Sequence, residues 1–285
     1  MKALIIGKSG QLAHELIDEK PNSTEVLCLG RGDVDICSIE SLGKAILEYS
    51  PSVIINASAY TAVDKAESDE DAAYAINQQA VKNIARLASK YNIRLLHVST
   101  DFVFDGQQSK AYLVDDNTNP CGVYGASKLA GEQEIQANCP ENSAVVRTSW
   151  LYSSYGNNFV KTMLRLMQEK PELGVVCDQI GCPTSANSLA KFLWKLTAVE
   201  SIEPMYHWSD YGVASWYDFA VAIQNIAFDE GLLTVKIPVQ PIPAASYPTP
   251  AKRPSFSLLN ASDSYSVKLT THWSEQLKRC ISKLS

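Results

Sequence analysis

The chain has 285 residues, of which 46% are hydrophobic and 20% are charged, and its formal net charge is −6. This length and apolar content suit one large α/β domain or two smaller lobes, and they exclude wholesale disorder. Acidic residues outnumber basic ones, 31 against 25, which is the opposite of the balance usual in proteins that bind a phosphate backbone. Nucleic acid is therefore not an expected partner.

The seven cysteines form no CxxC pair, and this pattern is typical of single thiols in a reducing compartment rather than of a zinc site. The apolar run at the N-terminus meets a glycine at once and is too short for a secretory signal. No stretch approaches the roughly 20 apolar residues that cross a bilayer, so no membrane insertion is expected. The sequence therefore predicts a cytoplasmic protein.

Strands and helices are expected to alternate along the first half of the chain. Short apolar runs predict strands at residues 2–6, 26–29, 52–56, 94–98 and 143–147. Amphipathic stretches predict helices at residues 11–19, 39–49, 69–90 and 123–138. This alternation is typical of an α/β fold with a parallel sheet covered on both faces.

The alternation is looser after Trp150. We expect a strand at 173–177 and helices at 159–169, 187–196 and 217–227. The segment 238–254 holds six of the thirteen prolines, which predicts an extended loop. We expect this part of the chain to form a smaller lobe that closes over the ends of the sheet strands.

The turn after the first predicted strand, Gly7-Lys8-Ser9-Gly10, leads directly into the first predicted helix. Glycine lets the backbone approach a pyrophosphate closely, and the N-terminus of the following helix presents free N–H groups and a positive dipole end. The position of Gly7 and Gly10 therefore predicts a dinucleotide site. A plain strand-to-helix turn is the alternative.

The end of the second predicted strand indicates which nicotinamide cofactor is preferred. Arg31 stands there, and a cation at this place suits a 2′-phosphate, which favours NADPH, with NADH as the alternative cofactor. Asp35 and Ile36 are placed to hold the adenine, with Asp35 accepting from its amine. For Arg31 and Asp35 the alternative is an exposed loop side chain. Small residues after Asn56, beginning with Ala57, leave room for a ligand at the sheet edge.

Tyr124 and Lys128 stand four residues apart in a predicted helix, so they share one face. An ammonium near a phenol stabilises the phenolate and lowers the pKa of the tyrosine, which makes Tyr124 a usable acid near neutral pH. Upstream, a predicted strand ends at Ser99-Thr100-Asp101, where a hydroxyl can polarise a substrate carbonyl. The glycine turn, this hydroxyl and the Tyr-x-x-x-Lys pair, in this order, form a specific combination.

With these motifs the chain resembles the extended short-chain dehydrogenase/reductases that act on nucleotide sugars, and within them the branch that reduces dTDP-4-dehydrorhamnose. The matching stretches run over nearly the whole length: GKSGQL (7–12), NASAYTAVDKAES (56–68), STDFVFDG (99–106), VYGASKLAGE (123–132), RTSWLY (147–152), NNFVKTMLRL (157–166), DQIGCPTS (178–185) and YPTPAKRPSFSLLN (247–260). The resemblance implies a Rossmann-type doubly wound parallel sheet. Residues 1–150 would form the NADP-binding domain, and residues 151–285 mainly the substrate-binding lobe, with some segments returning to the first domain.

The resemblance also implies a reaction. A hydride would pass from NADPH to C4 of dTDP-4-dehydro-β-L-rhamnose, giving dTDP-β-L-rhamnose for surface polysaccharide. Tyr124 would protonate the forming alkoxide, Lys128 would bind the nicotinamide ribose and tune Tyr124, and Thr100 would hydrogen-bond the C4 oxygen. The expected cofactor contacts are Gly7, Gly10, Gln11, Leu12, Arg31, Asp35, Ile36, Ala57, Ala59, Thr61, Tyr124 and Lys128. The expected substrate contacts are Thr100, Asp101, Trp150, Asn158 and Arg253.

Several alternatives stay open. Trp150 is expected to stack on a sugar or base, or else to pack in the core. Arg253 is expected to pair with the diphosphate, or else to be a surface arginine, and Asn158 to contact the nucleotide or to be structural. His97, in an apolar strand, is expected as a core histidine. The alternative functions are a reductase of another nucleotide-linked 4-keto-6-deoxy sugar, and a non-catalytic protein similar to regulatory subunits of methionine adenosyltransferase.

Some members of the resembled family are dimers linked by magnesium on carboxylates. Glu15 matches one of these acids, but Asn187 and Lys283 stand where the others would be. We therefore expect no metal site, while the resemblance still allows a homodimer.

Overall fold

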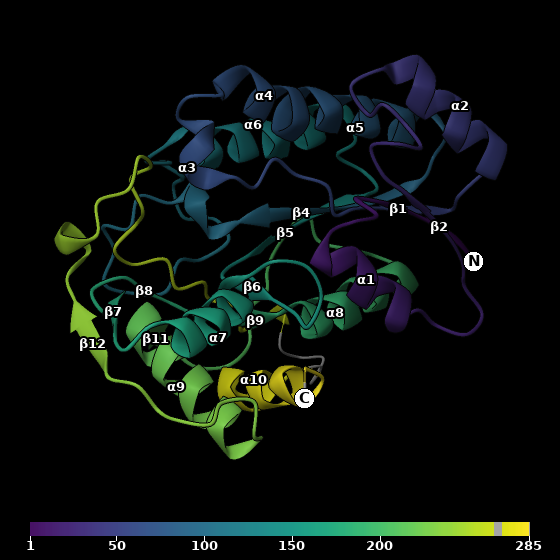
Figure 1. Cartoon of the computed structure of the whole chain (residues 1–285). Helices are drawn as coiled ribbons and strands as arrows, with labels where there is room; N and C mark the ends of the chain where they lie inside the picture. Colours follow the sequence, from purple (N-terminus) through teal and green to yellow (C-terminus); the bar gives the residue numbers. More distant parts are fainter. Residues whose placement is uncertain (265–269, 285) are drawn as a thin grey trace.

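The computed structural model describes residues 1–264 and 270–284 of the chain (Figure 1). Within these residues a parallel sheet of six strands has the order β10-β5-β4-β3-β1-β2. Its strands are β1 (Lys2–Ile6), β2 (Glu25–Leu29), β3 (Val53–Asn56), β4 (Arg94–Thr100), β5 (Ser143–Thr148) and β10 (Met205–His207). The strand order reverses at β1, and a crevice for ligands is expected beyond the carboxyl ends of the strands at such a point.

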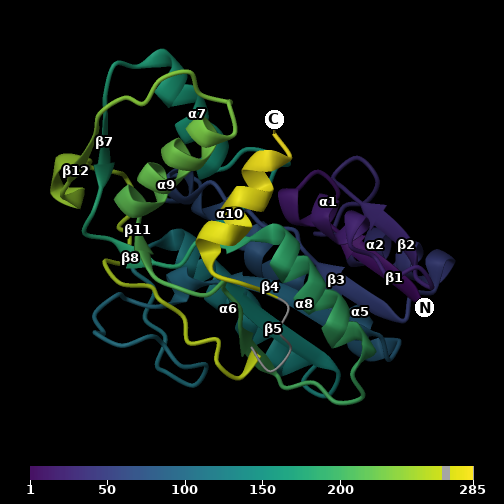
Figure 2. The same cartoon turned by 90° about the horizontal axis from the view of Figure 1, so that it is seen from below.

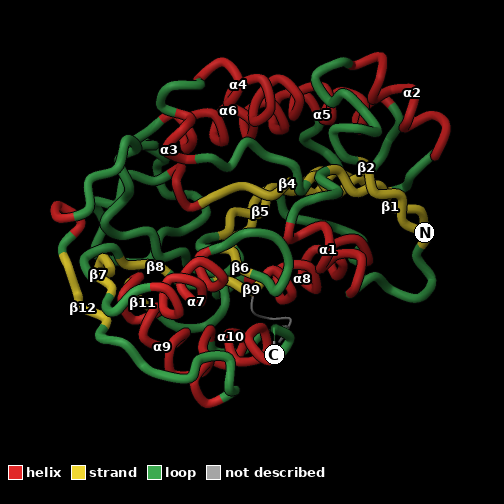
Figure 3. Tube along the Cα trace, viewed as in Figure 1, coloured by secondary structure: helices red, strands yellow, loops and turns green. Residues whose placement is uncertain are grey.

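Helices cover both faces of this sheet, and the strands form a single layer between them (Figure 3). One face carries α2 (Ile39–Tyr49), α5 (Ala80–Lys90) and α6 (Val123–Asn138). The other face carries α1 (Gln11–Asp18) and α8 (Ala186–Ala198). Successive residues of β1 point to opposite faces and are apolar on both, as in buried parallel strands. The predicted doubly wound parallel sheet is confirmed.

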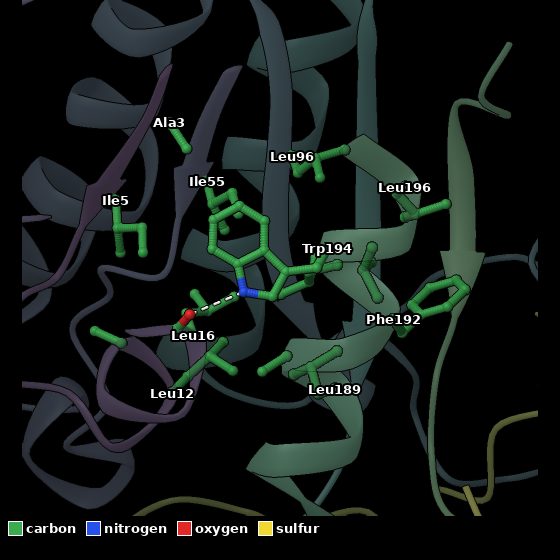
Figure 4. Packing of buried hydrophobic residues seen from close by; sticks show 14 of the residues in the cluster. Ala3, Ile5, Leu12, Leu16, Ile55, Leu96, Leu189, Phe192, Trp194 and Leu196 are labelled. Carbon is green, nitrogen blue, oxygen red and sulfur yellow. Dashed lines mark hydrogen bonds between the residues drawn. The ribbon is translucent and has the colours of Figure 1, made fainter. Parts of the chain in front are cut away.

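The core between the sheet and the α1–α8 layer is built around Trp194 (Figure 4). This side chain packs among apolar residues of α1 and the sheet, including Leu16 and Ile55. Its indole Nε1 donates a hydrogen bond to the carbonyl oxygen of Leu16 at 2.8 Å. A buried N–H without an acceptor would cost about 1–3 kcal/mol, so this bond lets a large aromatic side chain fill the gap between two helices.

On the opposite face, the expected helix over residues 69–90 is one helical run in three parts: α4 (Glu70–Tyr74), a π-helical turn (Ala75–Gln79) and α5. The longest described helix, α6, packs against this run with glycine at the closest approach. A Cβ at Gly131 would collide with the carbonyl oxygen of Asn77, and one at Gly125 with that of Phe102. The two glycines therefore let the backbone of α6 come close to these two carbonyl groups. No described helix is long and apolar enough to span a membrane.

The smaller lobe lies to one side of the sheet (Figure 2). Its helices are α7 (Phe159–Glu169), α9 (Trp216–Asp229) and α10 (Trp273–Ser282). Short strands pair around them: β6 (Leu151–Tyr152) with β9 (Thr184–Ser185), β7 (Leu173–Val176) with β12 (Val239–Ile242), and β8 (Ile180–Gly181) with β11 (Ala214–Ser215). A separate apolar cluster holds this lobe together, while α8 and β10 return to the main sheet.

The structure contains several elements that were not predicted, among them the two-residue strands β6, β8, β9 and β11. The proline-rich segment is not all loop, because residues 239–242 pair with β7 as β12 in a two-stranded sheet, where a proline is tolerated at an edge. The sequence analysis did not predict β10, which is only three residues long, or α10. It also missed the one-turn helix α3 (Val63–Ala66).

Candidate active site

A cleft of about 550 Å³ opens where the strand ends meet the smaller lobe. It brings together segments that are far apart in the sequence: the glycine turn, the ends of β3, β4 and β5, the start of α6, and residues of the lobe. Twelve predicted site residues line it: Gly10, Gln11, Leu12, Ala57, Ala59, Thr61, Thr100, Asp101, Tyr124, Lys128, Trp150 and Arg253. The predicted residues Gly7, Arg31, Asp35, Ile36 and Asn158 do not line it.

The glycine turn is shaped by close backbone contacts. Gly7 has φ +117°, and a Cβ there would lie 2.9 Å from backbone atoms of Ala57 and Ser58, so position 7 requires glycine. The N–H of Gly10 donates to the carbonyl oxygen of Gly7 at 2.8 Å. No side chain caps the N-terminus of α1, which starts at Gln11 on the cleft wall. This end of α1 can therefore receive a phosphate group.

Gln11 and Asn158 link the glycine turn to the lobe. Gln11 Nε2 donates to the carbonyl oxygen of Leu151 at 3.1 Å, and Gln11 Oε1 accepts from Asn158 Nδ2 at 3.2 Å. Asn158 Oδ1 also accepts from the N–H of Lys161 at 3.2 Å and thereby caps α7. Asn158 therefore caps α7 and bridges to Gln11, and it does not line the cleft.

The region after β2 is open to solvent. Arg31 and Asp35 are both exposed, and Asp35 Oδ1 accepts from the N–H of Cys37 at 2.9 Å. The sequence analysis overlooked Asp33, whose Oδ2 accepts from the N–H of Gly30 at 2.9 Å and from Lys8 Nζ at 3.3 Å. The hydrogen bond from Gly30, with a smaller contribution from Lys8, lowers the pKa of Asp33.

Tyr124 lies in the first turn of α6, on the cleft wall. Glu67 Oε1 accepts from the N–H of Val123 at 2.9 Å and holds the start of the helix. The Phe102 ring meets the Tyr124 ring edge-on at 5.5 Å. Burial of the phenol raises the pKa of Tyr124 to about 12, although a hydrogen bond with Thr100 lowers it. Tyr124 is therefore protonated at neutral pH, the form that a proton donor needs.

Lys128 lies one turn further along α6 and is only 2% exposed. Its Nζ donates to the carbonyl oxygen of Val98 at 2.7 Å and lies 3.3 Å from His97 Nε2. Burial lowers the pKa of Lys128 to about 8, against a raising effect of Glu132. The expected lowering of the Tyr124 pKa by Lys128 is not found in this state, because desolvation of the phenol dominates.

Hydroxyl and carboxyl groups gather at the ends of β4 and β5. Thr100 Oγ1 donates to Asp101 Oδ1 at 3.1 Å and accepts from the N–H of Phe102 at 3.2 Å. Burial raises the pKa of Asp101 to about 6. Thr148 is the register partner of Thr100 on β5 and also lines the cleft. Among the described residues, Thr148 Oγ1 is buried without a hydrogen-bond partner. Hydrogen bonds with Ser257 and Thr100 act on the Asp101 carboxyl and lower its pKa against the larger effect of burial.

The lobe contributes aromatic residues to the cleft. Trp150, at φ +48°, stacks on Trp216 with ring centroids 3.6 Å apart, and Phe159 packs on Trp216 at 4.7 Å. A Cβ at Gly181 would lie 2.8 Å from the Trp150 ring, so glycine makes room for the indole. The expected stacking of Trp150 on a sugar is limited by this arrangement, because Trp216 covers one face of its ring. Trp216 and Phe159 were missed because only the folded chain brings them beside Trp150.

Arg253 reaches the cleft from the proline-rich segment. Its Nη2 lies 2.7 Å from Asp64 Oδ2, and Asp64 Oδ1 accepts from the N–H of Ala251 at 3.3 Å. Asp64, which the sequence analysis did not assign to the site, thus orients Arg253. An arginine held in this way can turn its remaining donors to a diphosphate.

The residues around Glu15 do not fit a magnesium ion. Glu15 Oε1 accepts from Ser153 Oγ at 2.6 Å, Oε2 accepts from Asn187 Nδ2 at 2.9 Å, and Lys283 Nζ lies 4.0 Å from Oε2. An amide donor and an ammonium therefore occupy the places that oxygen ligands would need. The described residues contain no group of three or more His, Cys, Asp or Glu side chains suited to a metal.

Comparison with known proteins adds to this geometry. The family model of the RmlD substrate binding domain matches residues 1–285. A dTDP-4-dehydrorhamnose reductase of Sinorhizobium fredii is 38% identical, over 99% of this chain and 97% of that protein.

Two solved structures are also similar over nearly the full length of both chains. A dTDP-4-dehydrorhamnose reductase from Clostridium acetobutylicum has a TM-score of 0.94 at 38% identity, covering 100% of this chain and 99% of that one. A dTDP-4-dehydrorhamnose reductase from Bacillus anthracis, in complex with NADP, has a TM-score of 0.92 at 35% identity, covering 99% of each chain.

Proposed function

We propose, because the chain belongs to the RmlD substrate binding domain family, that it is an NADPH-dependent oxidoreductase that converts dTDP-4-dehydro-β-L-rhamnose into dTDP-β-L-rhamnose. The observation that carries this proposal is the meeting of Thr100, Tyr124 and Lys128 with the glycine turn in one cleft. NADPH, when bound, supplies the hydride that adds to C4 of the keto sugar. The product would serve the synthesis of surface polysaccharide.

Tyr124 is the proton donor in this proposal. As hydride adds to the carbonyl carbon, the C=O electron pair moves to the oxygen, and Tyr124 Oη transfers its proton there. Thr100 donates a hydrogen bond to the same oxygen, where negative charge grows in the transition state. Lys128 binds the nicotinamide ribose and, as an ammonium, stabilises the phenolate that remains.

The nucleotide ends of both ligands are bound by groups at the edges of the cleft. Gly10, Gln11 and Leu12 receive the pyrophosphate of the cofactor at the N-terminus of α1. Ala57, Ala59 and Thr61 line the path of the cofactor along the sheet edge. Gly7 shapes this turn, and Arg31, Asp35 and Ile36 hold the adenosine end outside the cleft. Asp101, Thr148 and the edge of Trp150 bind the sugar, and Arg253 binds its diphosphate.

We also propose that the two parts of the chain bind different ligands. Residues 1–150 bind the cofactor, and residues 151–285 mainly bind the nucleotide sugar, with α8 and β10 packed on the main sheet. Seven free cysteines suit the reducing cytoplasm, which we assign as the compartment. A homodimer is compatible with this assignment, and no nucleic acid partner is assigned.

The test is NADPH oxidation with dTDP-4-dehydrorhamnose, run beside UDP- and GDP-linked 4-keto-6-deoxy sugars. Turnover only or mainly with the dTDP-linked sugar is the expected result. Turnover with another nucleotide sugar alone would correct the substrate. No turnover with any of them, together with retained NADPH binding, would contradict the enzyme assignment and support a regulatory-subunit role.

A further inference from the structure

A histidine that the proposed reaction does not use, His97, lies next to Lys128. His97 lies on β4 with no exposed surface, and its Nε2 is 3.3 Å from Lys128 Nζ. The other ring nitrogen, Nδ1, is 2.9 Å from Asn56 Nδ2 on the neighbouring strand β3. A row of three buried side chains therefore runs from Asn56 through His97 to Lys128.

The orientation of the Asn56 amide is fixed by Ser58. Asn56 Oδ1 accepts from the N–H of Ser58 at 3.1 Å and from Ser58 Oγ at 2.6 Å. A backbone N–H is only a donor, so the oxygen of the amide must face Ser58 and its NH2 group must face His97. The Nδ1 atom of His97 then accepts, and the proton of the neutral ring lies on Nε2.

Burial, with a further effect of Lys128, lowers the pKa of His97 well below its usual range, so the ring is neutral. Its Nε2–H thus points at Lys128 Nζ. An ammonium has three donors and no acceptor, whereas a neutral amine has a lone pair that can accept. We propose that His97, held by Asn56 as the Nε2–H tautomer, is a positioning residue that favours the neutral amine of Lys128 over its ammonium.

Other groups near Lys128 also affect the equilibrium between its ammonium and its neutral amine. Glu132, one turn further along α6, favours the ammonium, but Arg147 of β5 pairs with it at 2.7 Å and Ser99 of β4 donates to it at 2.5 Å. Tyr124, on the same helix, is protonated at neutral pH, and Asp101 follows β4 at the cleft. The negative charge of Glu132 is therefore already paired with Arg147, and it opposes the effect of the His97 N–H on Lys128 only weakly.

This arrangement deepens the proposed function and rests on it. After Tyr124 has given its proton to the sugar oxygen, a phenolate remains. The ammonium of Lys128 can return a proton to Tyr124 Oη and become an amine. A proton taken up from bulk solvent restores the ammonium, so that one proton is consumed in each turnover. By favouring the amine, His97 makes the ammonium a stronger acid and so a better proton source at neutral pH.

The test uses nuclear magnetic resonance on the full chain without cofactor. Nitrogen-15 labelling of the four histidines reports the tautomer of His97, and carbon-13 labelling of lysine reports the titration of Lys128, assigned by its loss in Lys128→Met. We expect the Nε2–H tautomer in the wild-type chain. In Asn56→Asp the new carboxylate accepts from Nδ1–H, the tautomer reverses, and the Lys128 midpoint rises by about one pH unit or more.

The matched control is the double variant Asn56→Asp/His97→Phe, which keeps the new charge but lacks the ring nitrogens. Its Lys128 midpoint is expected to rise much less than in Asn56→Asp alone. An Nδ1–H tautomer in the wild-type chain, or equal shifts in the single and double variants, would overturn the role of His97. Neither spectrum depends on turnover, so the two proposals can fail separately.

Discussion

The two ends of the proposed dinucleotide site are built in opposite ways. At the catalytic end, Thr100 and Lys128 are 5% and 2% exposed, and their polar atoms have partners on β4 or the residues that follow it. At the proposed adenosine end, Arg31 and Asp35 are exposed on a turn after β2. The catalytic end therefore has its geometry before any ligand binds, whereas the adenosine end is free to adjust.

This difference indicates where each end draws its specificity. A buried donor or acceptor is costly to leave unpaired, so the catalytic end discriminates strongly among groups placed there. The charge of an exposed arginine is screened by solvent, so its contact with a single phosphate contributes less binding free energy. Loss of the Tyr124 hydroxyl should accordingly cost much more activity than a substitution at the proposed adenosine end.

The largest effect is expected for Tyr124→Phe. The ring keeps its packing against Phe102, but the proton donor is gone, so kcat should fall by about 10²–10⁴-fold. Steady-state NADPH oxidation measures the loss, and titration of cofactor fluorescence should show unchanged NADPH binding. A variant with near-normal kcat would remove Tyr124 from the proposed mechanism.

Arg253→Lys is expected to have an intermediate effect. A lysine keeps the charge but loses the planar fork that can face Asp64 and a diphosphate together, so KM for the nucleotide sugar should rise by about tenfold, with kcat less affected. The matched variant Asp64→Asn keeps the arginine and removes its charged partner, and it should raise KM by a smaller factor. An unchanged KM in Arg253→Lys would contradict the diphosphate contact.

Arg31→Ala tests the open end of the site. Loss of a phosphate contact should weaken NADPH by about tenfold, while NADH, which has no 2′-phosphate, should be affected little. Binding of both cofactors is measured in parallel by fluorescence titration. Equal changes for the two cofactors, or none, would count against a 2′-phosphate contact and draw attention to Lys8 and Asp33 instead.

Thr148→Val is expected to have the smallest effect. The substitution keeps the shape of the side chain and removes a buried hydroxyl that has no partner in the described part of the chain. Stability should change little, while KM for the sugar should rise by a few-fold, on the order of one neutral hydrogen bond. Thermal unfolding measures the change in stability, and steady-state kinetics measure the change in KM, so the two effects can be told apart. A large loss of stability with an unchanged KM would assign Thr148 to the core.

The sequence predicted the elements with strong periodicity well. The expected helices at 39–49, 123–138 and 159–169 have these bounds in the structure. The first and the last are amphipathic and begin after capping side chains, Ser38 and Asn158, which define them locally. Tyr124 and Lys128 could be predicted to share a face because they stand four residues apart in an expected helix. Their environment could not, because burial and the contacts with Thr100 and Val98 determine the pKa of each group.

The residues that were missed depend on contacts between distant segments. Asp64 meets Arg253 across 189 positions, and Trp150 meets Trp216 only because the lobe folds back on the strand end. Thr148 could have been found, since a hydroxyl at the end of β5 lies beside Thr100 in any sheet that pairs these strands in register. The capping role of Asn158 could also have been found locally, because this residue stands directly before the expected helix at 159–169.

The two glycines of α6 give the molecule a property that its cleft alone does not show. Gly125 and Gly131 let the helix rest directly on the backbone of Phe102 and Asn77, and both contacts belong to the main α/β part of the chain. These two contacts between main chains therefore help to set the depth at which Tyr124 lies. A chain redesigned for a different sugar should therefore keep glycine at positions 125 and 131, whichever side chains of the lobe are exchanged.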